Sequence, residues 1–172
     1  MRGIIVFLSL LVSTFLIDQA IKAWAVDTAY QLHQTTSTSV SSPSEDVLNG
    51  TLLKKGKCIN LELYFNKGVA FSMFAFLGTW MKWIQGGLVL ILIFIIFKEK
   101  YYLHYAIPAG LLVGGALGNV YDRFIHQGVV DYIAWHCGFK YAVFNYADIA
   151  IDVAFVLILV MVYFSPKKSK IK

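Results

Sequence analysis

Four long runs of apolar residues dominate the pattern along this chain. They cover roughly residues 4–26, 79–97, 103–121 and 146–164. A helix needs about 20 apolar residues to cross the hydrocarbon core of a bilayer, so each run is long enough to span a membrane. Little chain remains for a separate soluble domain. The pattern therefore predicts an all-α membrane protein, in which residues 1–172 form a single polytopic domain with four transmembrane helices.

The longest break in this pattern is an outer loop over residues 27–78. Its first part, over 31–57, is rich in serine and threonine and has low complexity, which predicts a flexible segment. The next residues, CINLELYFN, alternate between apolar and polar side chains, and this alternation is the signal of a β-strand. The extended pattern continues through NKGVAFSMF. We predict a small extracytoplasmic β-sheet at the outer membrane surface.

The first apolar run also resembles a secretory signal peptide. Arg2 precedes the apolar residues, and the sequence Ala-Trp-Ala over residues 23–25 fits a cleavage site. However, Asp18 and Lys22 interrupt the end of the run. They are one helical turn apart, so their side chains can pair. We therefore expect an uncleaved first span.

The third run contains glycine at every fourth position, at Gly110, Gly114 and Gly118. Small residues at this spacing let a second helix approach closely. The plain interpretation is helix packing alone. Packing of this kind can also bring buried polar groups together.

Charge and composition define the orientation of the predicted spans. The chain is 58% hydrophobic, and this apolar content excludes an ordinary soluble domain. Its net charge is +5, and the positions of the charges matter more than the total. The basic residues near the spans are Arg2, the link residues Lys98 and Lys100, and the tail residues Lys167, Lys168, Lys170 and Lys172. An even number of spans places all of them on one side, which the positive-inside rule makes cytoplasmic. Both termini are then cytoplasmic, and the basic tail suits membrane lipids rather than nucleic acid. Lysines in the outer loop weaken this rule.

The two cysteines, Cys58 and Cys137, both face outward on this topology. A disulfide between them is one interpretation, which rests on the compartment alone. Two unpaired thiols is the other interpretation, and it is the default one.

Five of the ten acidic residues lie within or beside the apolar runs. They are Asp18, Asp122, Asp131, Asp148 and Asp152. A carboxylate at bilayer depth is costly and is by default a functional-site hypothesis. Two such groups brought together would share a proton and could perform acid–base chemistry.

Each of these acids also has a plainer interpretation. Asn145 and Asp148 fit a capping box at the start of the fourth span. Asp122 beside Arg123 fits a charge-neutralising pair. Asp152 lies one turn beyond Asp148, either as a second polar residue on the same face or as a bystander that faces water.

Other kinds of catalytic site have little support. The chain has no HEXXH motif and no spacing of His, Cys and Asp that suits zinc, so we expect no metal and no cofactor. It also has no G-x-S-x-G motif, which leaves a carboxylate pair as the simplest catalyst.

Five motifs, taken in order, resemble those of the lipoprotein signal peptidases (signal peptidase II). They are DQAIK (18–22), NKGVAFS (66–72), GGALGNVYDR (114–123), VVDYI (129–133) and FNYADIAI (144–151). The match extends from about residue 17 to 152. The sequence departs from the family pattern at Val69 and in the length of the linker over 27–57.

The resemblance implies a membrane aspartyl endopeptidase of the bacterial inner membrane, with its active site near the outer face. It would remove signal peptides from prolipoproteins by cutting on the N-terminal side of a diacylglyceryl-modified cysteine. The catalytic pair would be Asp131 and Asp148. The substrate-binding residues would be Asn66, Asn119, Arg123 and Asn145, and structural support would come from Asp18, Lys22, Asp122 and Gly68. We expect a monomer whose partners are lipid-modified signal peptides and membrane lipids.

Two other functions would also use these features. Intramembrane carboxylates line proton or ion pathways in transporters, although this chain is short and shows no inverted repeat. A non-enzymatic membrane scaffold could use the glycine face for packing alone.

Overall fold

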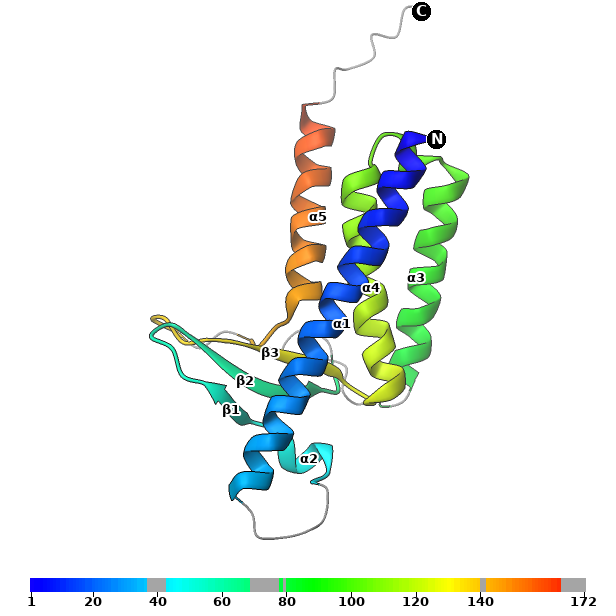
Figure 1. The fold of residues 1–172 in the computed structure, drawn as a ribbon. Coiled ribbons are helices and arrows are strands. Elements are labelled where there is room, and N and C mark those ends of the chain that lie inside the picture. Colours follow the sequence, from blue (N-terminus) through cyan, green and yellow to red (C-terminus); the bar gives the residue numbers. More distant parts are fainter. Residues whose placement is uncertain (37–42, 69–77, 79, 140–141, 165–172) are drawn as a thin grey trace, which may run out of the picture.

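The computed structural model describes residues 1–36, 43–68, 78, 80–139 and 142–164. Long helices run side by side, and a small sheet lies across one end of the bundle (Figure 1). The helical elements are α1 (Arg2–Thr36), α2 (Glu45–Leu48), α3 (Trp80–Lys98), the 3₁₀ helix η3 (Tyr101–Leu103), α4 (Ala106–Ile125) and α5 (Tyr146–Tyr163). The strands are β1 (Thr51–Lys54), β2 (Ile59–Asn66) and β3 (Val129–Trp135).

Three helices, α1, α3 and α5, are long and apolar enough to cross a membrane. The third predicted span, over 103–121, forms helix α4 over Ala106–Ile125. Polar residues at the C-terminal end of α4, together with its glycines, make it less apolar than its neighbours. The structure therefore confirms a mostly helical membrane protein with a small sheet, in which three helices have the composition of membrane spans.

Helix α1 is longer than the apolar run predicts. It continues to Thr36, ten residues past the predicted end at residue 26. The added turns are held by packing, because Ala25 and Ala29 are buried against the sheet residues Leu63 and Val130. With about 1.5 Å of rise per residue, a helix of this length exceeds the roughly 30 Å hydrocarbon core. Its C-terminal part projects past the sheet (Figure 1).

The sheet is antiparallel, with strand order β1-β2-β3. Strand β2 forms where the alternating pattern predicts it. Inside the segment predicted to be flexible, residues 45–54 form α2 and β1. The predicted extension through NKGVAFSMF falls largely on residues 69–77, outside the described residues.

Strand β3 carries Asp131, beyond the end of the apolar run over 103–121. Asp131 pairs with Tyr64 of β2. The first four residues of β3 are all buried, so the strand shows no alternation of apolar and polar residues. A strand buried on both faces lacks the pattern that identifies a half-buried one.

Helix α4 is the centre of the bundle, and its glycines set its distance from two neighbours. A Cβ added at Gly110 would lie 2.8 Å from the carbonyl oxygen of Phe7 in α1, and one at Gly114 would lie 2.7 Å from that of Leu11. On another face, a Cβ at Gly115 would lie 2.7 Å from the carbonyl oxygen of Ala147 in α5. The prediction that glycine spacing allows close helix approach is confirmed.

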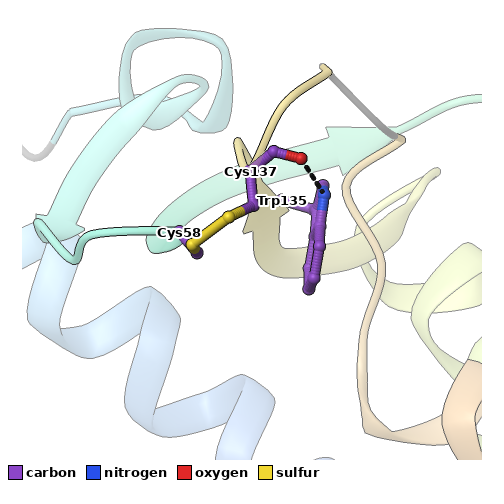
Figure 2. The surroundings of a disulfide bond; sticks show 3 residues. All are labelled: Cys58, Trp135 and Cys137. Carbon is purple, nitrogen blue, oxygen red and sulfur yellow. Dashed lines mark hydrogen bonds between the residues drawn. A yellow bond between two sulfur atoms is a disulfide. The ribbon is translucent and has the colours of Figure 1, made fainter.

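The two cysteines form a disulfide, so the default interpretation of unpaired thiols is wrong. Cys58 precedes β2 and Cys137 follows β3, and antiparallel pairing of the two strands brings their ends together (Figure 2). The backbone N–H of His136 donates to the carbonyl of Cys58 at 2.7 Å. The indole N–H of Trp135 donates to the carbonyl of Cys137 at 3.0 Å.

We predict that Gly114→Ala destabilises the bundle. The added methyl group would meet the backbone of α1, which cannot move without separating the helices. Overpacking of this kind costs about 1–3 kcal/mol, so the midpoint of thermal unfolding in detergent should fall by several degrees.

Gly87→Ala is the matched control, because a Cβ at Gly87 in α3 meets no described atom within 4 Å. Alanine there should leave the unfolding midpoint unchanged or raise it slightly. Equal midpoints for the Gly114→Ala variant and the wild type would contradict the close-approach argument.

Candidate active site

A cavity of about 360 Å³ opens where the sheet meets α4 and α5. Its polar lining consists of Asn66, Gln85, Asn119, Arg123, Asp131, Asp148 and Asp152. The rest of the lining is Gly68, Val129, Ala142, Val143, Phe144 and Ile149. The structure thus brings together the residues that the sequence nominates as catalytic or substrate-binding. Only Asn145 is absent from the lining, and it lies buried in contact with Asp131.

Asp131 is held by two amide donors. Its side chain is 3% exposed, and its Oδ1 accepts a hydrogen bond from Asn145 Nδ2 at 2.8 Å. Its Oδ2 accepts one from Asn66 Nδ2 at 3.0 Å. Asn66 comes from the end of β2, so the strand pairing itself aims this amide at the carboxyl group.

Asp148 is positioned by the capping box that the sequence predicts. Asn145 caps α5, its side chain accepts from the N–H of Asp148, and the Asp148 side chain accepts from the N–H of Asn145 at 3.2 Å. The other oxygen of Asp148 accepts from Asn119 Nδ2 at 2.8 Å. Capping and a place in the site are therefore compatible, because the cap turns the carboxyl group toward the cavity.

Burial and the neighbouring carboxylate raise the pKa of Asp131. Desolvation is the largest cause and the negative charge of Asp148 is the second, and together they bring the pKa to about 7. The hydrogen bonds from Asn66 and Asn145 favour the ionised form and oppose this rise. Repulsion of this kind favours one proton shared between the two carboxyl groups, which then titrate as a pair.

The orientation of the three asparagine amides follows from groups that can only donate. Asn66 Oδ1 accepts from the N–H of Gly68 at 3.0 Å, and Asn145 Oδ1 accepts from the N–H of Asp148 at 3.0 Å. Asn119 Oδ1 accepts from the ammonium group of Lys22 at 2.9 Å. Because an amide oxygen faces each of these donors, its NH₂ group must point the other way, toward Asp131 or Asp148.

The side chain of Arg123 binds residues in the wall of the cavity and does not pair with Asp122. Its guanidinium donates to the carbonyl oxygen of Gly68 and to the side-chain oxygen of Gln85 in α3. The predicted pair between Asp122 and Arg123 is wrong, since Asp122 binds Lys22 instead. Side chains of adjacent residues in a helix point in different directions and do not face each other, whereas side chains four residues apart do. The sequence analysis did not nominate Gln85, although a single amide side chain within an apolar run indicates a buried polar contact.

Behind the two site aspartates lies a cluster of three buried charges, Asp18, Lys22 and Asp122. The ammonium group of Lys22 lies 2.8 Å from Asp18 Oδ2 and 2.7 Å from Asp122 Oδ2. The predicted pairing of Asp18 with Lys22 is confirmed. Gln19, which the sequence analysis did not nominate, donates to Asp122 Oδ1 at 3.0 Å and to Asp18 Oδ2 at 3.2 Å.

The remaining acids and histidines lie outside this constellation. Asp152 is exposed and lines the cavity, so it faces water on the same side of α5 as Asp148. His126 contacts Glu45, and His136 contacts Glu62. Within the described ranges, no group of three His, Cys, Asp or Glu side chains could hold a metal ion.

Two solved structures share this fold. A bacterial membrane enzyme solved by the in meso method at 2.3 Å resolution has the same fold, with a TM-score of 0.69 and 22% identity, over 96% of this chain and 92% of that chain. A second bacterial membrane enzyme, solved at 1.9 Å resolution, gives a TM-score of 0.64 and 22% identity, over 93% of this chain and 94% of that chain. At this identity the likeness establishes the fold alone.

Sequence comparison identifies the family. The family model described as signal peptidase (SPase) II matches residues 10–164. The lipoprotein signal peptidase of Sulfurovum sp. (strain NBC37-1) is 48% identical over 98% of this chain and its own full length. That of Wolinella succinogenes is 40% identical over 93% of this chain and 94% of its own. The chain therefore belongs to the signal peptidase II family of proteases, and the resemblance carried by the five motifs is confirmed.

We predict that Lys22→Met strongly destabilises the protein. The change leaves Asp18 and Asp122 buried, close together and without their shared cation. Breaking a buried ion pair by removing one partner costs about 3–5 kcal/mol. The midpoint of thermal unfolding in detergent should fall accordingly.

The control is Lys67→Met, which removes an exposed lysine whose partner, Asp46, is also exposed. Exposed pairs contribute about 0–1 kcal/mol, so this variant should unfold near the wild-type temperature. A Lys22→Met variant as stable as the Lys67→Met variant would show that the cluster does not carry the stability assigned to it.

Proposed function

We propose that this protein is an aspartyl endopeptidase that removes signal peptides from bacterial prolipoproteins, with Asp131 and Asp148 as its catalytic pair. One observation carries the proposal. Two buried carboxyl groups line one cavity, and every contact made by their oxygens that is described above comes from an N–H or NH₂ donor. This environment leaves both carboxyl groups free to accept or hold a catalytic proton.

The reaction follows from the shared proton. The ionised member of the pair takes a proton from a water molecule, which attacks the carbonyl carbon of the scissile peptide bond. The protonated member donates its proton to the carbonyl oxygen. The roles then reverse, the leaving amine receives a proton, and the C–N bond breaks. The pair performs this chemistry as a unit, so neither residue is assigned as the base.

The substrate is a prolipoprotein cut on the N-terminal side of its diacylglyceryl-modified cysteine. Family membership supports this substrate, since relatives at 40% and 48% identity are named lipoprotein signal peptidases. The cavity also carries apolar residues beside the aspartates, among them Val143, Phe144 and Ile149. Such a surface suits the apolar part of a signal peptide while its helix and acyl chains stay in lipid. The enzyme acts as a monomer without a cofactor.

The protein spans the inner membrane four times, with both termini in the cytoplasm and the site at the outer face. Helix α4 is the third of the four spans in chain order, and its polar C-terminal end is shielded because Asp122 and Arg123 are buried by neighbouring elements. Arg2, Lys98 and Lys100 belong to helix ends away from the sheet, which supports a cytoplasmic location for that end. The disulfide between the sheet strands supports an oxidising compartment on the other side.

Asp131→Asn and Asp148→Asn are each expected to lower the cleavage rate by about 10²–10⁴-fold, because an amide can neither take up nor release the catalytic proton. The measurement is the turnover of a diacylated prolipoprotein peptide by purified protein in detergent. Thermal unfolding of each variant checks that it is folded.

Asp152→Asn is the matched control, since it changes an exposed carboxyl group that lines the same cavity one turn away. It should keep most of the activity. Near-normal turnover by either the Asp131→Asn or the Asp148→Asn variant would refute the catalytic pair.

The cleavage rate should fall as the pH rises above about 7. The pKa of Asp131 is raised to about 7, so the pair keeps its proton up to neutral pH and loses it above. Because the acid form is needed, the rate should then drop about tenfold per pH unit. Asn66→Ala removes a hydrogen bond that favours the ionised form of Asp131, so its alkaline limb should move to higher pH.

Asn60→Ala serves as the control for this shift. Asn60 lies on the same strand, but its amide donates to Glu62 and not to the site. Its pH profile should match that of the wild type. A rate that stays level up to pH 9 would contradict the shared proton, and identical profiles for the two asparagine variants would contradict the role of Asn66.

A further inference from the structure

The buried cluster of Asp18, Lys22 and Asp122 touches the backbone of both elements that carry the catalytic pair. Asp18 Oδ1 accepts a hydrogen bond from the N–H of Ala147 at 3.0 Å. Asp122 Oδ2 accepts one from the N–H of Val130 at 3.1 Å. Ala147 directly precedes Asp148, and Val130 directly precedes Asp131. Each carboxylate of the cluster therefore fixes the residue next to one member of the pair.

Lys22 connects these two attachments. Its ammonium group lies 2.8 Å from Asp18 Oδ2 and 2.7 Å from Asp122 Oδ2. The same group donates at 2.9 Å to Asn119, whose NH₂ group donates at 2.8 Å to the carboxylate of Asp148. The three donors of one ammonium group are thus all used within this arrangement.

We propose that Asp18, Lys22 and Asp122 are positioning residues, and that this cluster sets the separation and direction of the two catalytic carboxyl groups. The inference rests on the proposed function of Asp131 and Asp148. None of the three cluster residues lines the cavity. They act on the pair through Val130, Ala147 and Asn119, and through the positive charge of Lys22, which favours the ionised form of Asp131.

The topology explains why such a device is needed. Asp131 lies in strand β3 and Asp148 lies in helix α5, and the link between them includes residues 140–141, outside the described part of the chain. Helix α5 contacts α1 through Asp18 and α4 through Asn119, strand β3 contacts α4 through Asp122, and Lys22 of α1 binds Asp18, Asn119 and Asp122. The two rigid helices therefore give the strand and α5 a common reference. A displacement of about 1 Å at a catalytic group can cost about 10²-fold in rate.

The atoms of the cluster provide a matched pair of variants. Asp18→Asn and Asp122→Asn each remove one negative charge from the same cluster at the same side-chain size. Asp18 uses one oxygen for Lys22 and the other for the N–H of Ala147, so an amide must turn its NH₂ group toward one of these donors. Asp122 uses one oxygen for both Lys22 and the N–H of Val130. Its other oxygen accepts from Gln19, whose NH₂ group keeps its contacts with Asp18 Oδ2 and the carbonyl oxygen of Gly118 when this one is lost.

The two variants should therefore differ although their charges are equal. Asp18→Asn should lower kcat by about 10–100-fold with KM within twofold of the wild-type value, because the displaced carboxyl groups affect turnover and not substrate binding. Asp122→Asn should keep kcat within about threefold. Both constants are measured with the diacylated peptide, after thermal unfolding has established the folded fraction of each variant.

A second pair keeps the test decisive if the Asp18→Asn variant does not fold. Asp122→Ala removes the acceptor for Val130, whereas Asp122→Asn keeps it, so only the alanine variant should lose kcat. Equal kcat values within the pair that folds, or a change in KM alone, would overturn the positioning role.

The Asp148→Asn variant is measured alongside. If it turns over normally, the proposed function fails, whereas an inactive Asp148→Asn variant with equal kcat values in the matched pairs refutes the cluster alone.

Discussion

The close approach of α1 to α4 is the constraint on which the site depends. Glycines at 110 and 114 let the backbone of α1 lie where side chains would otherwise stand. At this distance Lys22 of α1 reaches both Asp122 and Asn119 of α4. The glycines of one helix therefore help to set where a charged side chain of the other can bind, and the positions of the two cavity aspartates depend on that spacing.

Buried polar groups must be satisfied, since an unpaired one costs several kcal/mol. The protein meets this demand with amides. Three asparagines donate to the two cavity acids, and each amide is oriented by a partner that can only donate. Among the described residues, no buried side-chain nitrogen or oxygen lacks a hydrogen-bond partner. The two acids are therefore held in defined positions by hydrogen bonds within the protein.

Local sequence patterns predicted the parts of this structure that depend on neighbours in the chain. The helices, strand β2, the capping box of Asn145 and Asp148, and the pairing of Asp18 with Lys22 all follow from short spacings. Contacts between distant segments were not predictable in this way. Strand β3 is hidden by burial, the extension of α1 depends on the sheet, and the choice of Lys22 over Arg123 by Asp122 depends on helix packing. The set of five motifs nominated the site residues where single spacings left alternatives open.

The disulfide has a consequence for how the chain is assembled. Cys58 and Cys137 are 79 residues apart, and both α3 and α4 lie between them. The two sulfur atoms meet when α3 and α4 have folded back on each other and β2 has paired with β3. The bond therefore links the two sides of this long loop and makes the pairing of the two strands difficult to reverse.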